Sequence, residues 1–248
     1  MNPVRSALAD SQNSILIDSL VVGHLGRPVI SINQLLLRQG KVTALIGPSG
    51  CGKTSLLNCV NGLANPIAGS ITFSLDGRTS AIPPKFRIGR TFQGFPVIPW
   101  LRIRDNFLLR GEIVGCGIDP SAELTSVGAP HLIDRFPATL SGGERAKCAI
   151  ALALAGNSAI LLMDEPFNGL DHWVRKDIVE QVSKWTKDRA LVTLIVTHDV
   201  YDASLAADEI ILLRGKPTTI KRRLERNQPD IAIPIDDIKS ALEKLEED

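Results

Sequence analysis

The sequence predicts an α/β fold built around a mainly parallel β-sheet. Three observations support this prediction: the 248 residues are 44% hydrophobic and 22% charged, apolar strand-like runs recur along the chain, and helix-like segments separate many of them. A chain of this size and composition can bury a large core. Strands separated by helices are joined by crossover connections, which make neighbouring strands parallel.

The first third of the chain predicts two kinds of strand. The segments "SILIDSLVVGHL" and "GRPVISINQLLL" alternate in hydrophobicity around a turn at Gly26, and "AGSITFSLDGR" predicts a hairpin that turns at Asp76-Gly77. Between them, "GKVTALIG" predicts a buried strand that ends in glycine. The helix predicted over "KTSLLNCVNGL" then closes near Gly62.

The rest of the chain predicts an interrupted core and a tail. Residues 95–157 have helical periodicity broken by glycine and proline, and strands alternate with helices again from "AILLMDEP" to "DEIILLRG". We therefore expect a core at 15–94 and 158–215, with a helical insert at 95–157. Residues 216–248 predict a short C-terminal tail with a helix, on which Ile238, Leu242 and Leu245 share one face.

Charge and cysteine content narrow the class of protein. A formal net charge of +1 argues against a dedicated nucleic-acid binder, whose surface is usually strongly basic. The four cysteines have neither metal-ligand nor paired spacing, which indicates free thiols in a reducing compartment. The N-terminal segment lacks the apolar core of a signal peptide. The sequence also contains no uninterrupted run of about 18 apolar residues, which is the length that indicates a membrane-spanning helix. We expect a soluble intracellular protein with no nucleic-acid partner.

The segment "GPSGCGKT" fits a phosphate-binding loop, because it follows a predicted strand and opens a predicted helix. Glycines let backbone N–H groups wrap a phosphate chain, and the helix N-terminus adds positive charge. Lys53 would reach the β- and γ-phosphates, and the Thr54 hydroxyl would bind Mg²⁺. The alternative is a glycine turn that only begins a helix. The expected nucleotide contacts are Gly47, Pro48, Ser49, Gly50, Cys51, Gly52, Lys53, Thr54 and Ser55.

Polar side chains end two of the later apolar strands. The segment "AILLMDEP" ends in Asp164 and Glu165, and "ALVTLIVTHD" brings His198 to the end of another strand. Ligands bind at this carboxyl edge in open α/β sheets. Asp164 would hold Mg²⁺, Glu165 would polarise an attacking water, and His198 would hydrogen-bond nearby. Alternatively, the two acids only end a strand at a polar turn and the histidine is structural.

The segment "LSGGERAKC" places two glycines at a helix start, which costs helix stability and indicates close approach by another group. Ser141 can cap this helix and also donate a hydrogen bond to a phosphate oxygen. No comparable role at a phosphate site explains why Glu144, the residue after the two glycines, is acidic. A carboxylate near a triphosphate must point away, pair with Arg145 or Lys147, or favour the helix dipole.

Six motifs together resemble those of ABC-type ATPases: "GPSGCGKT", "TFQ", "LSGGE", "LLMDEP", "NGLD" and "THD", in that order. The resemblance covers about residues 15–215 and assigns residues 1–215 to an ABC ATPase domain. It implies a P-loop NTPase fold: a RecA-like parallel or mixed sheet core, an inserted α-helical subdomain and an N-terminal antiparallel β subdomain. It also implies a head-to-tail dimer that sandwiches two ATP molecules with Mg²⁺.

The same resemblance implies roles for further residues. Gln93, which ends "TFQ", would contact Mg²⁺ and the attacking water and would hinge the insert to the core. Ser141, Gly142 and Gly143 would cap the ATP held by the partner subunit's phosphate loop. Asp171 of "NGLD" would cross the dimer interface.

The stretch "GFPVIPWLRIRDNF", with "LLMDEPF" and "THDVYDASLAADEIILL", is similar to bacterial importer ATPases of the nitrate/sulfonate/taurine group. This implies a homodimer or heterodimer on the cytoplasmic face of the inner membrane. It would drive a permease for a small polar solute and contact the membrane only through that permease. The apolar residues that would form a groove for the permease are Phe95, Val97, Ile98, Trp100 and Leu101; alternatively, they pack the insert's own core.

Two other classes stay open. Soluble Fe–S assembly ATPases resemble this chain in the Glu after Ser-Gly-Gly and in the Gly-Leu-Asp sequence. A regulatory or weakly active ABC subunit is favoured by departures from the common motifs, which occur at His24, Glu144, Leu152, Asn168 and Gly169.

His24 stands 23 positions before Gly47, where the family often has an aromatic residue that stacks on adenine. Imidazole offers a smaller face, so we expect weaker or less base-selective nucleotide binding than with an aromatic residue there. His24→Tyr should therefore lower the Kd for ATP in a fluorescence titration. An unchanged Kd would show that residue 24 does not stack on the base.

Overall fold

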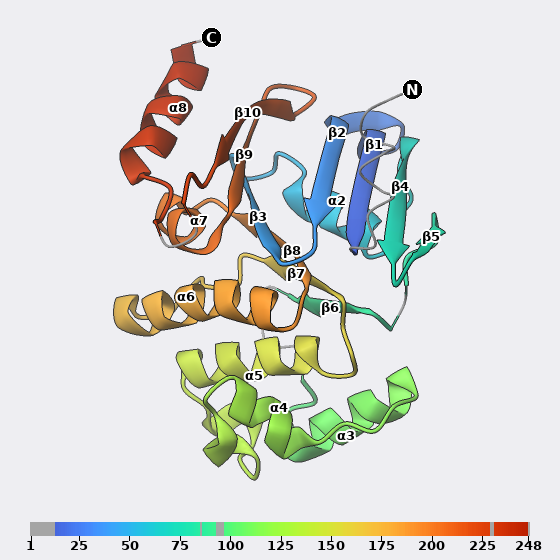
Figure 1. The fold of residues 1–248 in the computed structure, drawn as a ribbon, viewed down its shortest axis with the longest axis vertical. Coiled ribbons are helices and arrows are strands. Elements are labelled where there is room, and N and C mark those ends of the chain that lie inside the picture. The colour runs from blue at the N-terminus through green and yellow to red at the C-terminus, as the bar shows by residue number, and fades with distance from the viewer. Residues whose placement is uncertain (1–12, 85, 93–96, 229–230, 248) are drawn as a thin grey trace.

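The computed structural model describes residues 13–84, 86–92, 97–228 and 231–247. They form two β-sheets surrounded by helices, and Figure 1 shows the helices of the insert gathered at one end of the molecule. The predicted α/β class, with an antiparallel N-terminal part and a helical insert, is confirmed.

The smaller sheet is antiparallel, with the strand order β2-β1-β4-β5. The predicted hairpin turn lies between β4 and β5, where Asp76 and Gly77 have φ values of 50° and 74°. Two successive residues at positive φ match the right-handed twist of the strands they connect. The strands are β1 (Ser14–His24), β2 (Arg27–Arg38), β4 (Ala68–Leu75) and β5 (Arg78–Ser80).

The larger sheet has the order β10-β9-β3-β8-β7-β6 and is parallel except for β10, which runs antiparallel to β9. The short strand β6 was not predicted, because its four residues include Gly89 and Arg90 and are too few to show a period. The strands are β3 (Lys41–Ile46), β6 (Ile88–Thr91), β7 (Ile160–Asp164), β8 (Val192–Thr197), β9 (Glu209–Arg214) and β10 (Thr219–Glu225).

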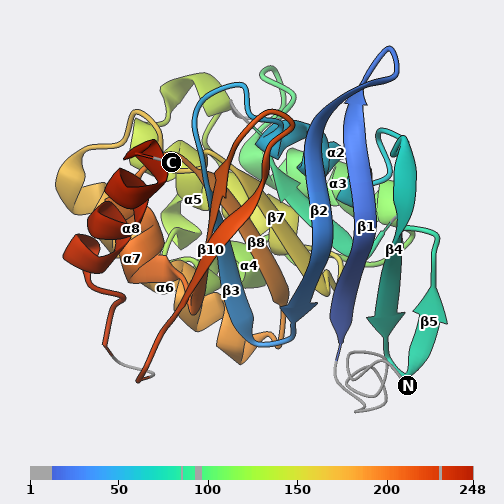
Figure 2. The ribbon, with the colours of Figure 1, turned by 90° about the horizontal axis from the view of Figure 1, so that it is seen from above.

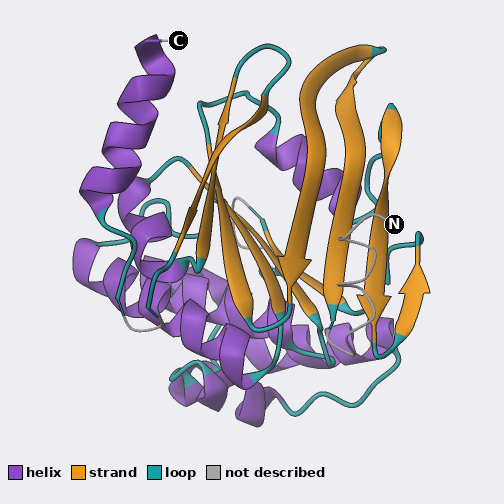
Figure 3. Cartoon of the chain, turned by 45° about the horizontal axis from the view of Figure 1, so that its top comes forward, coloured by secondary structure: helices purple, strands orange, loops and turns teal. Residues whose placement is uncertain are grey.

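Both faces of the larger sheet are covered. In β7, Leu161 and Met163 belong to the apolar cluster that includes α5 and α6, whereas Ile160 and Leu162 belong to a second cluster with α2 and the antiparallel sheet. Figures 2 and 3 show these two covers on opposite sides of the strands. Burial on both faces explains why the core strands have continuous apolar sequences.

Helices supply the outer layers and the insert. The insert contains α3 (Ile103–Val114), α4 (Pro120–Ser126), η1 (Pro130–Leu132), η2 (Pro137–Thr139) and α5 (Gly142–Leu154). The others are α2 (Lys53–Val60), α6 (His172–Asp188), α7 (Val200–Ala206) and α8 (Ile235–Glu247). Among the described residues, no helix combines the length and the apolar character that a membrane crossing requires.

The C-terminal segment contributes a strand as well as the predicted helix. The sequence of β10, TIKRRLE, is mostly polar and largely exposed at the edge of the sheet, so no apolar pattern predicted it. On α8, Ile238 and Ala241 are buried in the core, and Leu242 and Leu245 are partly buried beside them. The predicted apolar face of this helix is confirmed.

A capping box starts α5 and explains Glu144. The Glu144 backbone N–H donates to Ser141 Oγ at 3.3 Å, and the Ser141 backbone N–H donates to Glu144 Oε2 at 2.7 Å. The pKa of Glu144 is lowered chiefly by this backbone hydrogen bond. Of the alternatives open for Glu144, its place at the helix start fits the capping box, whereas Lys147 pairs with Asp177. The sequence carries the S-x-x-E signal of this box.

Glu144→Ala should lower the free energy of unfolding by about 1 kcal/mol, because it removes half of a capping box. Glu144→Gln should retain most of the stability, since the amide oxygen can accept the same hydrogen bond. Urea unfolding by circular dichroism measures both, with the exposed Glu112→Ala in α3 as control.

The stabilising effect of Glu144 should depend on pH. Its folded pKa is lowered, so the carboxylate contributes above its ordinary pKa and loses its contribution as the pH falls through the folded value. Equal stabilities of Glu144→Ala and Glu112→Ala at neutral pH would contradict this account.

Candidate functional site

The predicted phosphate loop connects β3 to α2. Gly52 forms the N-cap of α2 with φ 97°, a conformation that favours glycine. Lys53 is only 6% exposed, and its ammonium donates to the carbonyls of Gly47 at 2.7 Å and Pro48 at 3.0 Å. The cation is therefore held inside the loop, at the positive end of α2, where it can bind an anion.

A cavity of about 400 Å³ lies against this loop. Two parts of the predicted site reach it from elsewhere in the chain: His24 from the end of β1, and Glu165 from the end of β7. The phosphate-loop residues that line it are Ser49, Gly50, Gly52, Lys53, Thr54 and Ser55.

Thr54 and Asp164 form an oxygen-donor pair in this region. The Thr54 hydroxyl donates to Asp164 Oδ1 at 3.2 Å, and Asp164 is buried. Hydroxyl and carboxylate oxygens suit Mg²⁺, which usually takes one or two protein ligands together with phosphate oxygens and water. In the described part of the chain, no group of three or more His, Cys, Asp or Glu residues could hold a metal alone. The pair therefore fits a metal that arrives with a phosphate ligand.

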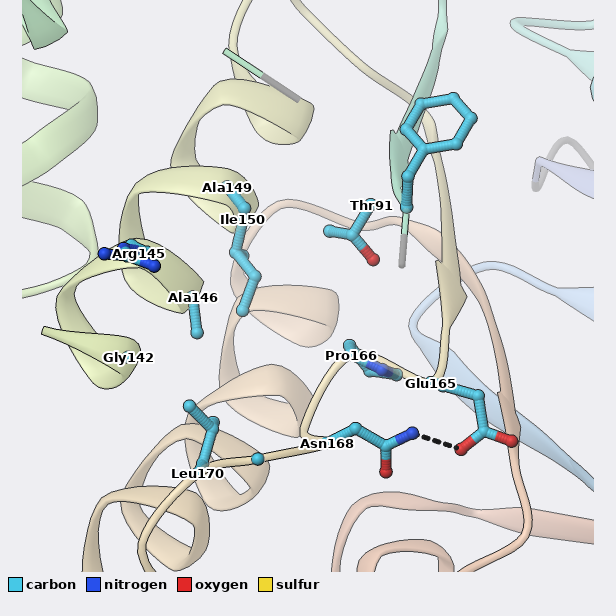
Figure 4. Close-up of a pocket in the computed structure, with 12 residues that line it drawn as sticks. Thr91, Gly142, Arg145, Ala146, Ala149, Ile150, Glu165, Pro166, Asn168 and Leu170 are labelled. Atoms are coloured by element: carbon cyan, nitrogen blue, oxygen red, sulfur yellow. Dashed lines mark hydrogen bonds between the residues drawn. The ribbon is translucent and has the colours of Figure 1, made fainter. Parts of the chain in front are cut away.

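Glu165 is held in an unusual conformation directly after Asp164. Its backbone has φ 48°, in the left-handed region that non-glycine residues occupy uncommonly. Its Oε2 lies 2.7 Å from His198 Nδ1 and accepts a hydrogen bond from Asn168 Nδ2 at 3.2 Å. Figure 4 shows the contact with Asn168. Asn168, a departure from the common motif, therefore contacts Glu165, which was not predicted from the sequence.

Arg90 is a second residue that sequence reasoning missed. Its Nη2 lies 3.4 Å from Asp164 Oδ2, and its Nη1 donates to Asn58 Oδ1 at 2.7 Å. Burial lowers the pKa of Arg90, and the charge of Asp164 opposes that shift. An arginine in an otherwise uncharged four-residue strand was the only signal in the sequence.

A clamp of charged residues joins α6 to the segment after His198. The Arg175 guanidinium donates to both oxygens of Asp202, at 2.6 Å and 2.7 Å, and lies 2.5 Å from Asp199. The hydrogen bonds to Asp202 raise the pKa of Arg175, and burial raises the pKa of Asp202. This clamp fixes the first turn of α6, which begins after Asp171, relative to His198.

A second cavity, of about 580 Å³, lies between α5 and the loop that follows β7. Figure 4 shows Gly142, Arg145 and Ala146 of α5 on one side, with Glu165 and Leu170 across from them. The end of β6 also contributes, through Thr91 and Phe92. Glu165 lines this cavity as well as the one at the phosphate loop.

The structure does not bring all the predicted residues to one place. The predicted residues that are not among the described residues lining the phosphate-loop cavity are Gly47, Pro48, Cys51, Asp164, His198, Ser141, Gly142, Gly143 and Asp171. Of these, Gly47, Pro48 and His198 line a separate cavity. Gly143 has a packing reason within its own chain, because a Cβ there would lie 2.4 Å from Val174 Cγ1 of α6. The predicted residues Gln93 and Phe95 lie outside the described part of the chain.

The segment expected to receive a permease precedes α3. Trp100 is 76% exposed, whereas Val97, Ile98 and Leu101 are half-buried. Buried Asn106 holds the segment in place, since it accepts from the Ile98 N–H at 2.7 Å and donates to nearby carbonyls. Of the four residues, Trp100 faces solvent, whereas Val97, Ile98 and Leu101 are partly packed against the insert.

Known proteins resemble this chain in sequence and in fold. The profile of the ABC transporter family matches residues 32–168. The aliphatic sulfonates import ATP-binding protein SsuB 2 of Burkholderia cenocepacia is 36% identical over 212 residues, which cover 85% of this chain and 76% of that one. The taurine import ATP-binding protein TauB of Escherichia coli O157:H7 is 34% identical over 216 residues, covering 85% and 84%.

The fold has solved counterparts. A dimeric bacterial ABC transporter cassette, MJ0796, matches 86% of this chain and 100% of its own with a TM-score of 0.73 at 24% identity. The family profile spans more than half of the chain, from β2 through the phosphate loop to Asn168. With relatives above 30% identity over most of its length, the chain belongs to the ABC transporter family.

Proposed function

We propose that this chain is the ATP-hydrolysing subunit of an ABC importer for a small polar solute. The observation that carries the proposal is a single cavity where Lys53 and Thr54 of the phosphate loop meet Glu165. An anion-binding cation, a metal-binding hydroxyl and a water-orienting carboxylate are the parts that phosphoryl transfer to water requires. The names of the sulfonate and taurine import relatives support an importer.

In the proposed reaction, the loop N–H groups and Lys53 bind the triphosphate. Lys53 exchanges its bonds to loop carbonyls for phosphate oxygens. Mg²⁺, held by Thr54 and Asp164, would neutralise phosphate charge. Glu165 orients the attacking water and accepts its proton, while His198 holds the Glu165 carboxylate. Gln93 keeps its proposed role beside the metal and the water.

A dimer is part of the proposal, because one chain leaves its serine-glycine helix start away from its own phosphate loop. In the capping box Ser141 Oγ acts only as an acceptor, so its O–H can still donate to a phosphate oxygen. A second copy, or a related subunit, would present Ser141 and Asp171 to this cavity. The matched MJ0796 cassette is itself described as dimeric.

We place the subunit at the cytoplasmic face of the membrane, bound to a permease through the segment before α3. Exposed Trp100 beside half-buried Ile98 and Leu101 offers an apolar contact surface there. The transport names of the sulfonate, bicarbonate and taurine relatives favour the importer over the Fe–S assembly alternative. An active subunit is favoured over a weakly active one because Lys53, Thr54 and Glu165 all line the phosphate-loop cavity.

Glu165→Gln should keep ATP binding but reduce turnover by at least about 100-fold, because the amide cannot accept the proton of water. The variant should accumulate as an ATP-bound dimer. Phosphate release and sedimentation velocity measure the two effects. Glu180→Gln, an exposed change on α6, should leave both unchanged. Full hydrolysis by Glu165→Gln would remove Glu165 from its assigned role.

Affinity purification of the tagged chain from membranes should recover a polytopic permease. Trp100→Ala should reduce that recovery severalfold, because a large exposed aromatic contact is lost. Leu25→Ala, which removes an even more exposed apolar side chain in the β1–β2 turn, should not. Recovery of a soluble Fe–S scaffold protein in place of a permease would refute the importer proposal.

A further inference from the structure

Asp164 has a different partner on each carboxylate oxygen. Its Oδ1 accepts from the Thr54 hydroxyl at 3.2 Å, and its Oδ2 faces the Arg90 guanidinium at 3.4 Å. Both charged side chains are buried, with exposures of 4% for Arg90 and 5% for Asp164. The carboxylate that fits a metal is therefore already paired with a cation of the protein.

The Arg90 guanidinium is fixed from several directions. Its Nη1 donates to Asn58 of α2, and its Cζ lies 4.7 Å from the ring centroid of Phe92. Its Nε is buried and has no hydrogen-bond partner among the described residues. Arginine stays protonated at any physiological pH, so this positive charge is permanent.

Such a pair is a costly way to stabilise a fold. Removing two charges from water carries a penalty that their attraction often fails to recover, and apolar replacements are frequently neutral. The pair does have an electrostatic consequence at the site. A triphosphate beside Asp164 and Glu165 meets two negative charges, and Arg90 offsets one of them without any metal.

We propose that Arg90 supplies a fixed positive charge to Asp164 that a divalent cation would otherwise have to supply alone, so that ATP binding depends only weakly on Mg²⁺. The inference rests on the proposed function, since it assumes that the phosphate loop binds ATP. Arg90 acts here as a positioning residue through Asp164. It does not replace the metal in hydrolysis.

The test measures binding of a fluorescent ATP analogue to the intact chain, once in EDTA and once in excess Mg²⁺. For the natural sequence, the two Kd values should lie within about tenfold of each other. In Arg90→Gln the ratio should rise by about a further tenfold, mainly through weaker binding in EDTA, because Asp164 then repels the phosphates unopposed. Arg90→Lys, which keeps the charge, should behave as the natural sequence does.

Arg87→Gln is the matched control. Arg87 immediately precedes β6 and pairs with Asp76 at 2.7 Å, away from the phosphate loop, so its removal should leave the ratio unchanged. Circular dichroism establishes that each variant is folded. The measurement on the natural sequence needs no variant, and a ratio clearly above tenfold overturns the proposal even if Arg90→Gln does not fold.

Two other results have distinct meanings. An unchanged ratio in folded Arg90→Gln, or an equal rise in Arg87→Gln, overturns the role of Arg90 and leaves the proposed function standing. Failure of the natural sequence to bind the analogue in either solution overturns the proposed function and this inference together.

Discussion

A buried carboxylate must find partners inside the protein, and Asp164 sets this requirement at the carboxyl edge of the core sheet. Thr54 at the start of α2 meets one of its oxygens, and Arg90 in β6 approaches the other. These residues come from separate parts of the chain. The parallel pairing of β6 with β7, together with the helix that follows β3, brings them to one edge of the sheet. The Asp164 carboxylate is thus the point at which the end of the phosphate loop, β6 and β7 meet.

Sequence patterns predicted the parts of the structure that have strong periods or distinctive local chemistry. The buried strands β3, β7 and β8 are long apolar runs, and the loop before Lys53 has a fixed spacing of glycines. Because parallel strands end at a common edge, the proximity of Glu165 and His198 could be inferred from their positions after two such runs.

Other features could not be predicted because they depend on tertiary contacts. The four residues of β6 are too few for a period, and β10 is polar because it lies at a sheet edge. The ion pair between Arg90 and Asp164 joins residues 74 positions apart, which no local pattern encodes. The role of Glu144 was different: a favourable place at the helix start was one of the alternatives predicted for it, and the S-x-x-E spacing that encodes the reciprocal cap with Ser141 is local and visible in the sequence.

The contact of Arg175 with Asp199 and Asp202 has a mechanical consequence. A bidentate pair resists rotation as well as separation, so it leaves no hinge between the first turn of α6 and the start of α7. The pair ties the first turn of α6 to Asp199, the residue that follows His198, so a displacement of that turn would also act on the end of β8. Because His198 contacts Glu165 Oε2, the position of the first turn of α6 and the surroundings of the Glu165 carboxylate are linked through this one ion-paired contact.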